Sequence, residues 1–352
     1  MRTVSTRFAL TCFALFAGIL PINAEDWHKL RTDPHTLNNK QDALAFADAR
    51  VGWYGNGTGR VYKTIDSGEH WTQVWRHRGT YVRALEFADA KTGFLGNVGP
   101  GYFPDVGDLQ PFYRTRDGGV TWSAVRYTGP RVVGICAIDV LKLDGKTVIH
   151  AGGRVGGPAG MLESHDGGIT WRSIDLGFAT GMILDIKFLD AKIGFIAGAS
   201  ESNESRAHAR LLKTTDGGEN WRPVFESTRA GDVNWKLAFP SVQVGYATII
   251  SYDAPQKEAR GYVVKTEDGG EHWKPLLVSS DPEWIPYGIS FLDDNHGFVG
   301  GSTGGYETKD GGKIWSKVSF GYSVNKIRFV TVSGGHRRGF AIGQSLYRGD
   351  LN

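Results

Sequence analysis

The sequence predicts an all-β fold, a single seven-bladed β-propeller whose blades are four-stranded antiparallel sheets. Three observations carry this prediction. A motif of the form Ser/Thr-x-Asp-x-Gly-x-x-Trp occurs six times, about every 50 residues, a period typical of propellers. A different hairpin pattern occurs seven times, once before each copy of the motif and once after the last. Glycine is abundant, with 49 residues among 352, as expected for tight turns between short strands.

The first 24 residues have the features of a secretory signal peptide. A positively charged start precedes an apolar run over residues 8–20, which is too short to span a membrane, and Ala24 marks a cleavage point. An uncleaved anchor helix is the alternative. We expect residues 25–352 to form the propeller, without a membrane span once the signal is removed, and the protein to be exported to the periplasm or the extracellular space.

Each repeat begins with the seven-fold hairpin pattern, two short strands joined by a tight turn. The copies are LAFADARVGWYG (44–55), LEFADAKTGFLG (85–96), IDVLKLDGKTVIHAGG (138–153), IKFLDAKIGFIAG (186–198), LAFPSVQVGYATI (237–249), ISFLDDNHGFVGG (289–301) and IRFVTVSGGHRRGFAIG (327–343).

The Asp-containing motif is expected to form the turn of a second hairpin in each repeat. Its glycines permit positive φ, and its carboxylate can accept hydrogen bonds from N–H groups of its own turn. No second carboxylate recurs beside the Asp, as a calcium loop would require. We therefore expect a structural role, with no metal, cofactor or catalytic residue in the motif. Its aspartates are Asp66, Asp117, Asp166, Asp216, Asp268 and Asp310.

The sequence has seven hairpins but six motifs, and the segments at its two ends explain the difference. SLYRGD (345–350) resembles the strand that precedes a motif, but no Trp strand follows it. DWHKL (26–30) has the Trp-x-x-aliphatic pattern of an outer strand, with no strand before it. We expect residues 26–30 to join the last blade as its fourth strand, which closes the ring and removes a free sheet edge.

Composition excludes several classes of partner. The formal net charge of +3 is too balanced to indicate nucleic-acid binding. The 10 histidines show no spacing typical of a zinc site. Cys136 would be the only cysteine left after signal removal, so no intramolecular disulfide is expected.

The motif resembles the Asp box of BNR repeats, which occurs in sialidases, sortilin-type receptors, xyloglucanases and the photosystem II assembly/stability factor family. The resemblance covers residues 25–352 and is strongest to the assembly factors, which have one seven-bladed propeller, a box in most blades and an export signal. It implies a non-enzymatic scaffold that binds a protein client, in the thylakoid lumen if the organism is photosynthetic. Sialidases carry an Arg-Ile-Pro motif near their start, and this sequence has none.

Strand order puts the Asp boxes and the short hairpins on one face, the box face, and the longer connections on the other. We name the second one the loop face; its long segments are 97–112, 198–210 and 251–262. Aromatic residues and arginines there are candidate client-binding residues, because such side chains anchor protein interfaces. They are Tyr81, Arg83, Tyr102, Phe103, Arg131, Trp235, Trp284, Tyr287, Tyr322 and Arg328. Packing between blades is the alternative for each aromatic residue.

A glycan-active propeller, either a sialidase-like or other glycoside hydrolase or a lectin, is the second hypothesis. Two carboxylates about 5–10 Å apart would serve a glycosidase. Candidate carboxylates on the loop face are Asp105, Asp108, Asp232, Asp253, Asp281 and Glu283. The alternative for them is a solvated position in a loop.

Overall fold

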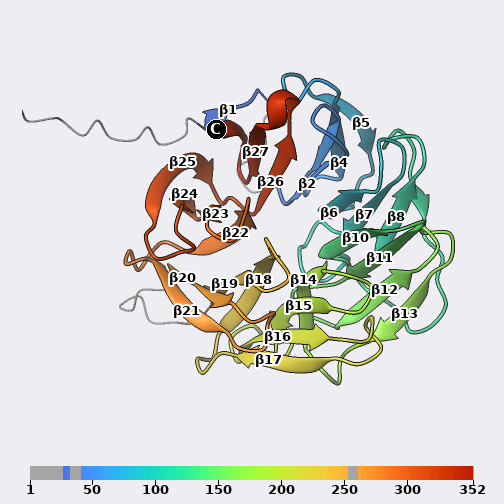
Figure 1. Ribbon diagram of the computed structural model, residues 1–352. Coiled ribbons are helices and arrows are strands. Elements are labelled where there is room, and N and C mark those ends of the chain that lie inside the picture. Colours follow the sequence, from blue (N-terminus) through green and yellow to red (C-terminus); the bar gives the residue numbers. More distant parts are fainter. Residues whose placement is uncertain (1–26, 32–40, 253–260, 352) are drawn as a thin grey trace, which may run out of the picture.

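The protein is an all-β ring of seven blades, as the sequence predicts. In the computed structural model, which describes residues 27–31, 41–252 and 261–351, seven four-stranded antiparallel sheets surround a central axis (Figure 1). The one helical element of these residues is η1 (Ser333–Gly335), a 3-10 turn. The expected signal peptide, residues 1–24, lies outside the described residues.

Blades 1 to 6 each use four consecutive strands, with the first strand nearest the axis and the fourth at the rim. Blade 1 contains β2 (Ala43–Phe46), β3 (Gly52–Gly55), β4 (Arg60–Thr64) and β5 (Thr72–Arg76). Blade 2 contains β6 (Val82–Phe87), β7 (Gly93–Asn97), β8 (Phe112–Thr115) and β9 (Ser123–Ala124). Blade 3 contains β10 (Ala137–Leu143), β11 (Lys146–Gly152), β12 (Gly160–Ser164) and β13 (Arg172–Asp175).

The other half of the ring repeats this order. Blade 4 contains β14 (Met182–Phe188), β15 (Gly194–Ala199), β16 (Ala209–Thr214) and β17 (Arg222–Glu226). Blade 5 contains β18 (Asp232–Ala238), β19 (Gly245–Ser251), β20 (Gly261–Thr266) and β21 (Lys274–Ser279). Blade 6 contains β22 (Pro286–Phe291), β23 (Gly297–Gly301), β24 (Thr303–Thr308) and β25 (Ser316–Tyr322). Blade 7 combines β26 (Lys326–Thr331), β27 (Arg337–Ile342) and β28 (Leu346–Leu351) with β1 (His28–Lys29).

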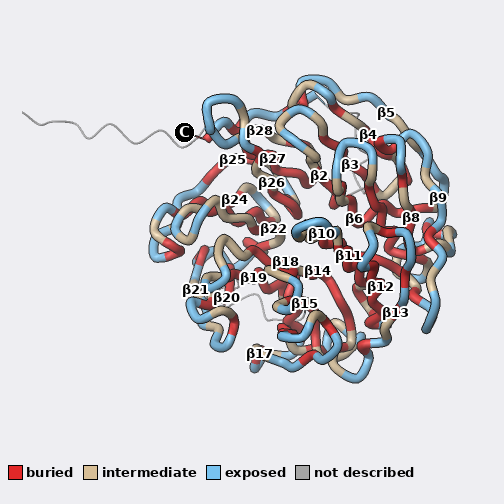
Figure 2. Tube along the Cα trace, turned by 45° about the vertical axis from the view of Figure 1, so that its right-hand side comes forward, coloured by how far each residue is buried: buried red, intermediate tan, exposed pale blue. Residues whose placement is uncertain are grey.

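Burial decreases from the axis to the rim (Figure 2). The inner strand β18 is buried along its whole length, whereas the outer strand β17 has no buried residue.

Aromatic rings fill the seams between blades: Phe87 stacks on Trp53 of the preceding blade, with ring centroids 3.5 Å apart. A Cβ added to Gly93 would lie 2.4 Å from the Phe87 ring, so glycine is what lets this ring lie flat against its own hairpin.

The N-terminal strand closes the ring, as expected from the missing seventh motif. β1 pairs with β28 in antiparallel register, and Figure 1 shows it beside the C-terminal end of the chain. The Leu30 N–H donates to the Leu346 carbonyl at 2.8 Å, which extends the pairing beyond β1. Blade 7 therefore has four strands, taken from both ends of the sequence.

Each of the six Asp boxes is held by the same set of hydrogen bonds. In the second box the Thr115 hydroxyl donates to Asp117 at 2.8 Å and accepts from the Gly119 N–H at 2.9 Å. Asp117 also accepts from the Thr121 N–H at 2.9 Å. The Gly118 N–H donates to the Lys91 carbonyl at 2.9 Å, which ties the box to the first hairpin of its own blade. The boxes and the short hairpins therefore share one face.

Replacing Asp117 with alanine is expected to lower the free energy of unfolding by about 1 kcal/mol, the usual net value of a hydrogen bond. Hydrogen bonds from the side chain and backbone of Thr121 lower the pKa of Asp117 to about 2, whereas an unfolded chain has a value of about 3.9. The folded pKa is the lower one, so the stabilisation is present above about pH 4 and is lost as the pH falls toward 2.

Thermal unfolding of the wild type and of Asp117→Ala, followed from neutral pH into acid, measures this difference. Asp105→Ala serves as the control, because Asp105 is an exposed aspartate of the same blade. A difference in Tm between the wild type and Asp117→Ala that persists undiminished at about pH 2 contradicts the prediction.

Candidate functional site

The loop-face end of the central channel is filled by buried side chains from blades 2 to 5 and by half-buried side chains of blade 6. Inner strands begin at the loop face, so residues at their starts meet there with residues from the ends of the second strands. We name this group the mouth cluster. It consists of Tyr81, Val98, Val106, Cys136, Val155, Met182, Leu184, Ala199, Ala207, Val233, Trp235 and Ile250, with Tyr102, Ile285 and Tyr287 half-buried against it.

The long segment 97–112 lies across this mouth cluster. The Phe103 ring stacks on Tyr81 with centroids 4.7 Å apart and planes 8° from parallel. The next ring, Tyr102, meets Phe103 edge to face at 4.9 Å and hydrogen-bonds with Tyr252 of blade 5. Segment 97–112 thus connects blade 2 with blade 5 across the loop-face end of the channel.

An arginine fastens the same segment to blade 3. Arg154 donates from Nη1 to the Pro100 carbonyl at 2.9 Å and from Nε to the Gly157 carbonyl at 2.9 Å. These bonds restrict the segment, which favours a preformed surface over one that must be ordered on binding. Two of the rings that it presents or contacts are partly open to solvent, Phe103 at 36% and Tyr252 at 41% exposure.

A charged pair lies buried beneath the aromatic rings. Arg83 is 4% exposed and Asp42 is 2% exposed, with 3.6 Å between Arg83 Nη1 and Asp42 Oδ2. The Arg83 guanidinium lies over the Trp235 ring at 5.2 Å, and the Tyr81 hydroxyl donates to Asp42 at 3.1 Å. Burial lowers the pKa of the Arg83 guanidinium, but the Asp42 carboxylate, with Cys136, Tyr81 and Asp185, raises it above its ordinary value.

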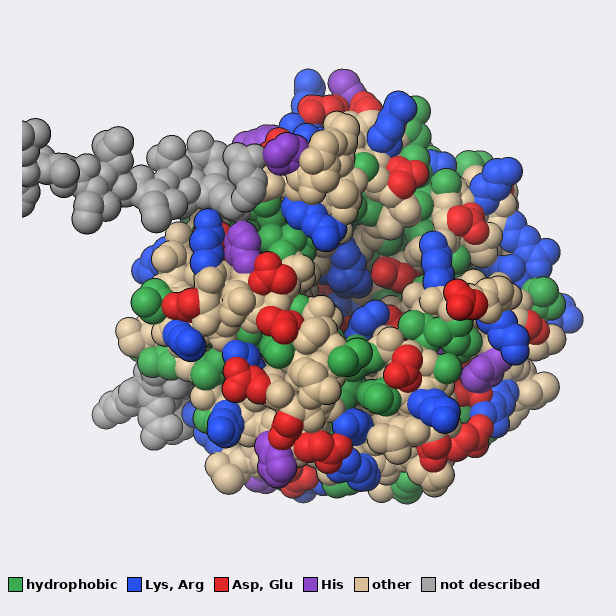
Figure 3. Space-filling view, in the orientation of Figure 1, with side chains coloured by type: hydrophobic (Ala, Val, Ile, Leu, Met, Phe, Trp, Pro, Cys, Tyr) green, Lys and Arg blue, Asp and Glu red, His purple; other side chains and the backbone are tan. Residues whose placement is uncertain are grey.

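Further along the channel, toward the box face, the lining is charged. The Lys236 ammonium donates to the Leu184 carbonyl at 3.0 Å, and its Nζ lies 3.7 Å from Asp185. Burial lowers the pKa of Lys326 to about 7. Arg328 lies 3.5 Å from Glu86 beside a cavity of about 200 Å³. In the space-filling view the centre of the ring is hollowed, with basic and acidic side chains inside it (Figure 3).

The structure brings six of the ten candidate binding residues together. They are Tyr81, Arg83, Tyr102, Phe103, Trp235 and Tyr287, which belong to the mouth cluster or contact it. Burial raises the pKa of Tyr81 and of Tyr287, so both hydroxyls are neutral near pH 7.

The other four candidates lie elsewhere. Trp284 is 2% exposed, packs against Tyr306 with centroids 4.8 Å apart, and donates to the Thr303 carbonyl, so it belongs to the core between blades. Arg131 is exposed between blades 2 and 3, and Tyr322 is 58% exposed between blades 6 and 7. Arg328 lies toward the box-face end of the channel, against Glu86.

The candidate carboxylates are spread over separate hydrogen-bond networks. Asp108 accepts from the Tyr113 hydroxyl at 2.7 Å within blade 2. Asp232, fully buried in blade 5, accepts from Tyr262 at 2.9 Å and from Arg229 at 3.1 Å. Asp105, Asp281 and Glu283 are exposed. Asp253 lies outside the described residues.

The described residues have neither a metal-binding cluster nor a membrane-spanning helix. Residues 27–31, 41–252 and 261–351 contain no group of three or more His, Cys, Asp or Glu side chains placed to hold a metal ion. No helix in this part of the chain is long and apolar enough to cross a membrane.

Sequence reasoning missed the partners that organise the site. Asp42 precedes the first inner strand and pairs with an arginine of the next blade, 41 residues later. Arg154 lies in a glycine-rich segment and gives no local signal of the loop that it fastens. Both contacts join different blades, so no pattern within one repeat marks them.

Comparisons with known proteins agree with the propeller fold. No protein-family model matches the chain. The chain is 26% identical over 173 residues to the photosystem II assembly lipoprotein Ycf48 of Synechococcus sp. (strain CC9902), a match that spans 47% of this chain and 47% of that protein. The match therefore covers about half the length of this curated relative.

Two solved structures are similar over most of this chain. Ycf48 bound to D1 peptide superposes with a TM-score of 0.65 at 16% identity and covers 95% of this chain and 98% of that one. An ancestral GH74 enzyme has the same TM-score, 0.65, at 16% identity, and covers 93% of this chain and 46% of that one. At these identities the structures show a shared fold. The sequence match supports the resemblance to the photosystem II assembly factor family.

Proposed function

We propose, from the similarity to Ycf48, that this protein is a non-enzymatic, exported scaffold that binds a protein client on its loop face. One observation carries the proposal: partly exposed aromatic rings lie on a preformed surface over the channel. Phe103 presents its ring from a segment held by Arg154, and Tyr81 supports that ring from below. Aromatic side chains that are already rigid lose little conformational entropy on binding, and they often dominate protein interfaces.

The known relatives add to this proposal in two ways. The curated relative is described as an assembly lipoprotein, and one of the similar structures holds a peptide. Both descriptions favour a client that is a protein over a small molecule. The signal peptide expected over residues 1–24 supports an encounter outside the cytoplasm, in the periplasm or the extracellular space.

Site-specific crosslinking tests the proposal. A photo-crosslinking amino acid at Phe103 is expected to capture a defined protein from the exported fraction of native cells. The same group at Ile314, which is 70% exposed on a box turn, is the matched control on the opposite face and is expected to capture none. Phe103→Ser is expected to reduce binding of the captured protein about tenfold, the effect of losing one aromatic anchor.

Several results would contradict the proposed function. Equal capture from Phe103 and Ile314 would remove the role of the loop face. Undiminished client binding by Phe103→Ser would show that the Phe103 ring does not anchor the client. Hydrolysis of a polysaccharide or sialoside by the purified protein would favour the glycan-active alternative instead, and its loss on Asp232→Ala would assign that activity to the loop face.

A further inference from the structure

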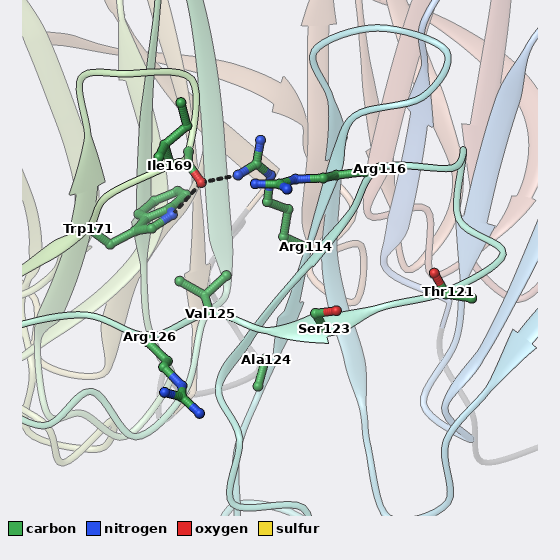
Figure 4. A pocket seen from close by; sticks show the side chains of 10 residues that line it. Arg114, Arg116, Thr121, Ser123, Ala124, Val125, Arg126, Ile169 and Trp171 are labelled. Carbon is green, nitrogen blue, oxygen red and sulfur yellow. Dashed lines mark hydrogen bonds between the residues drawn. The ribbon is translucent and has the colours of Figure 1, made fainter.

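A pocket on the box-face rim, between blades 2 and 3, is lined by three arginines. Arg114, Arg116 and Arg126 come from blade 2 and the segment that leaves it, and Ile169 and Trp171 of the third Asp box form the opposite wall (Figure 4). The cavity measures about 470 Å³. Among the described residues that line it there is no aspartate or glutamate. We name it the arginine pocket.

Three other seams of the same ring have a glutamate at this position, whereas the second and sixth boxes have Val120 and Lys313. In three of the boxes, the third residue after the Asp is a glutamate that pairs with a basic side chain of the preceding blade. Glu271 accepts from Lys213 at 2.6 Å and from Arg222 at 2.7 Å. Glu219 accepts from Arg172 at 2.8 Å, and Glu69 pairs with Arg348. A carboxylate thus bridges the box of one blade to the basic side chains of the blade before it.

The seam between blades 2 and 3 keeps the basic side of this arrangement and lacks the acid. Arg114 donates to the carbonyls of Gly167 (3.2 Å) and Gly168, just as Lys213 donates to Gly269 at 2.7 Å in its own seam. The glutamate position is occupied by Ile169, which is 69% exposed. The guanidinium is therefore placed as in the other seams, but the third box, which faces it, has no glutamate at this position, and its nearest carboxylate is that of Asp166.

The charge of the arginine pocket is only partly compensated. Arg114 Nε is buried and has no hydrogen-bond partner among the described residues. Burial, and then the neighbouring Arg116 guanidinium, lower the pKa of Arg114, and the Asp166 carboxylate offsets this only in part, so the two cations still repel each other. Figure 4 shows the two guanidinium groups directed to the same side, toward the third box. A carboxylate between them would relieve this repulsion.

We propose that the arginine pocket is a second contact for the protein client and that it receives a glutamate or aspartate side chain of an acidic peptide segment. The proposal rests on the proposed function, since the carboxylate comes from that client. The chain itself supplies the argument for a peptide: in three other seams the carboxylate at this place is a glutamate side chain on a polypeptide. Exposed Ile169 offers an apolar surface for the residue beside it.

Titration with short peptides tests this site without the client. The probe is the blocked peptide Gly-Gly-Glu-Leu-Glu-Gly-Gly, and its counterpart with glutamine in place of both glutamates is the control. Binding is read from the NMR signals of ¹⁵N-labelled arginine side chains at low salt. The signals of Arg114 and Arg116 are expected to shift with the acidic peptide, and the glutamine peptide is expected to bind about tenfold more weakly.

Two matched pairs of variants locate the binding. Ile169→Glu restores the carboxylate of the other seams within the chain, so the acidic peptide is expected to bind about tenfold more weakly, because an attached group competes at high effective concentration. Val242→Glu adds the same charge at a 57% exposed site and is expected to leave binding within about twofold. Arg116→Gln is expected to weaken binding about tenfold, whereas Arg78→Gln, on the loop face, has little effect.

Equal binding of the peptide to the wild type and to Ile169→Glu would overturn the proposal. So would stronger binding of inorganic phosphate or of an oligogalacturonate than of the peptide, because either would assign the arginines to another chemistry. Crosslinking at Phe103 is independent of these titrations. If no client is captured at Phe103, the proposed function is contradicted, but the result of the peptide titration stands unchanged. The two proposals can therefore fail separately.

Discussion

Replacing Trp27 with alanine is expected to lower the free energy of unfolding by about 3–5 kcal/mol, the usual cost of removing a large buried aromatic side chain. Trp27 is 8% exposed. It packs edge to face against Phe298 at 5.6 Å and Phe320 at 5.1 Å, both in blade 6. A Cβ added to Gly339 of blade 7 would lie 2.4 Å from its ring. One side chain thus connects the closing strand with two blades.

The effect of Trp27→Ala comes from packing alone. The Trp27 Nε1 is buried without a hydrogen-bond partner among the described residues, whereas Trp122 donates its Nε1–H to the Gly119 carbonyl of its own box at 3.0 Å. Blade 7 has no box to offer such a carbonyl. Deletion of residues 25–31 removes Leu30 as well, which is 7% exposed, and exposes an edge of β28; it is expected to destabilise the ring further.

Urea unfolding, followed by far-ultraviolet circular dichroism of the β-sheets, measures the stability of Trp27→Ala and of the deletion variant. His28→Ala is the matched control, because His28 is exposed in the same strand, and it is expected to stay within about 0.5 kcal/mol of the wild type. If Trp27→Ala is no less stable than His28→Ala, closure by the N-terminal strand contributes nothing to the stability of the propeller.

The architecture could be predicted because each of its signals is repeated. One hairpin or one Asp box would be a weak indication of a propeller, but seven and six of them at a constant period leave few alternatives. The closing strand was predicted from what the repeats lacked. It was expected over residues 26–30 and is found as β1 (His28–Lys29), with the Leu30 N–H extending the ladder.

Contacts between blades could not be predicted in the same way. The alternation within a strand shows that a side chain is buried, but it does not show which side chain of the next blade it meets. Trp284 illustrates this: its position at the start of an inner strand suggested the channel, whereas its ring turns into the seam against Tyr306. Tyr81 and Trp235 share similar positions in other blades and reach the mouth cluster. The rotation of each side chain, set by its neighbours, makes the difference.

The missing glutamate of the arginine pocket could be predicted from the sequence only in part. The substitution of Ile169 for an acid is visible in the aligned boxes, because Glu69, Glu219 and Glu271 occupy the same place. The effect of this difference on the neighbouring basic side chains cannot be seen in the sequence. Only the structure shows that the basic partners belong to the preceding blade, and that Arg114 keeps its orientation when the acid is absent.

Replacing Asp42 with asparagine is expected to lower the free energy of unfolding by about 3 kcal/mol or more, because it leaves the buried Arg83 charge uncompensated. Asparagine has nearly the same shape as aspartate, so the change isolates the charge. Asp42 and Arg83 are 2% and 4% exposed, so both charges are removed from bulk water. The lost carboxylate is also the group that contributes most to raising the pKa of Arg83 against the effect of burial.

A double-mutant cycle separates the pair from its parts. Arg83→Met removes the cation and retains an apolar stem against the Trp235 ring, which lies 5.2 Å from the guanidinium in the wild type. The double variant Asp42→Asn, Arg83→Met is expected to be more stable than Asp42→Asn alone, since no buried charge remains. Glu201→Gln is the exposed control: its pair with Arg206 is solvent-accessible at both ends, and the expected loss is below about 1 kcal/mol.

The outcome bears on the function as well as on stability. Asp42 accepts from Tyr81, and Tyr81 supports the exposed Phe103 ring, so the charged pair and the aromatic surface are parts of one stack. Asp42→Asn is therefore expected to weaken client capture at Phe103 under conditions where the variant remains folded, and Glu201→Gln is not. Equal stability of Asp42→Asn and the wild type would mean that solvent reaches Arg83, and the loop-face surface would then lack the rigid support on which its proposed role depends.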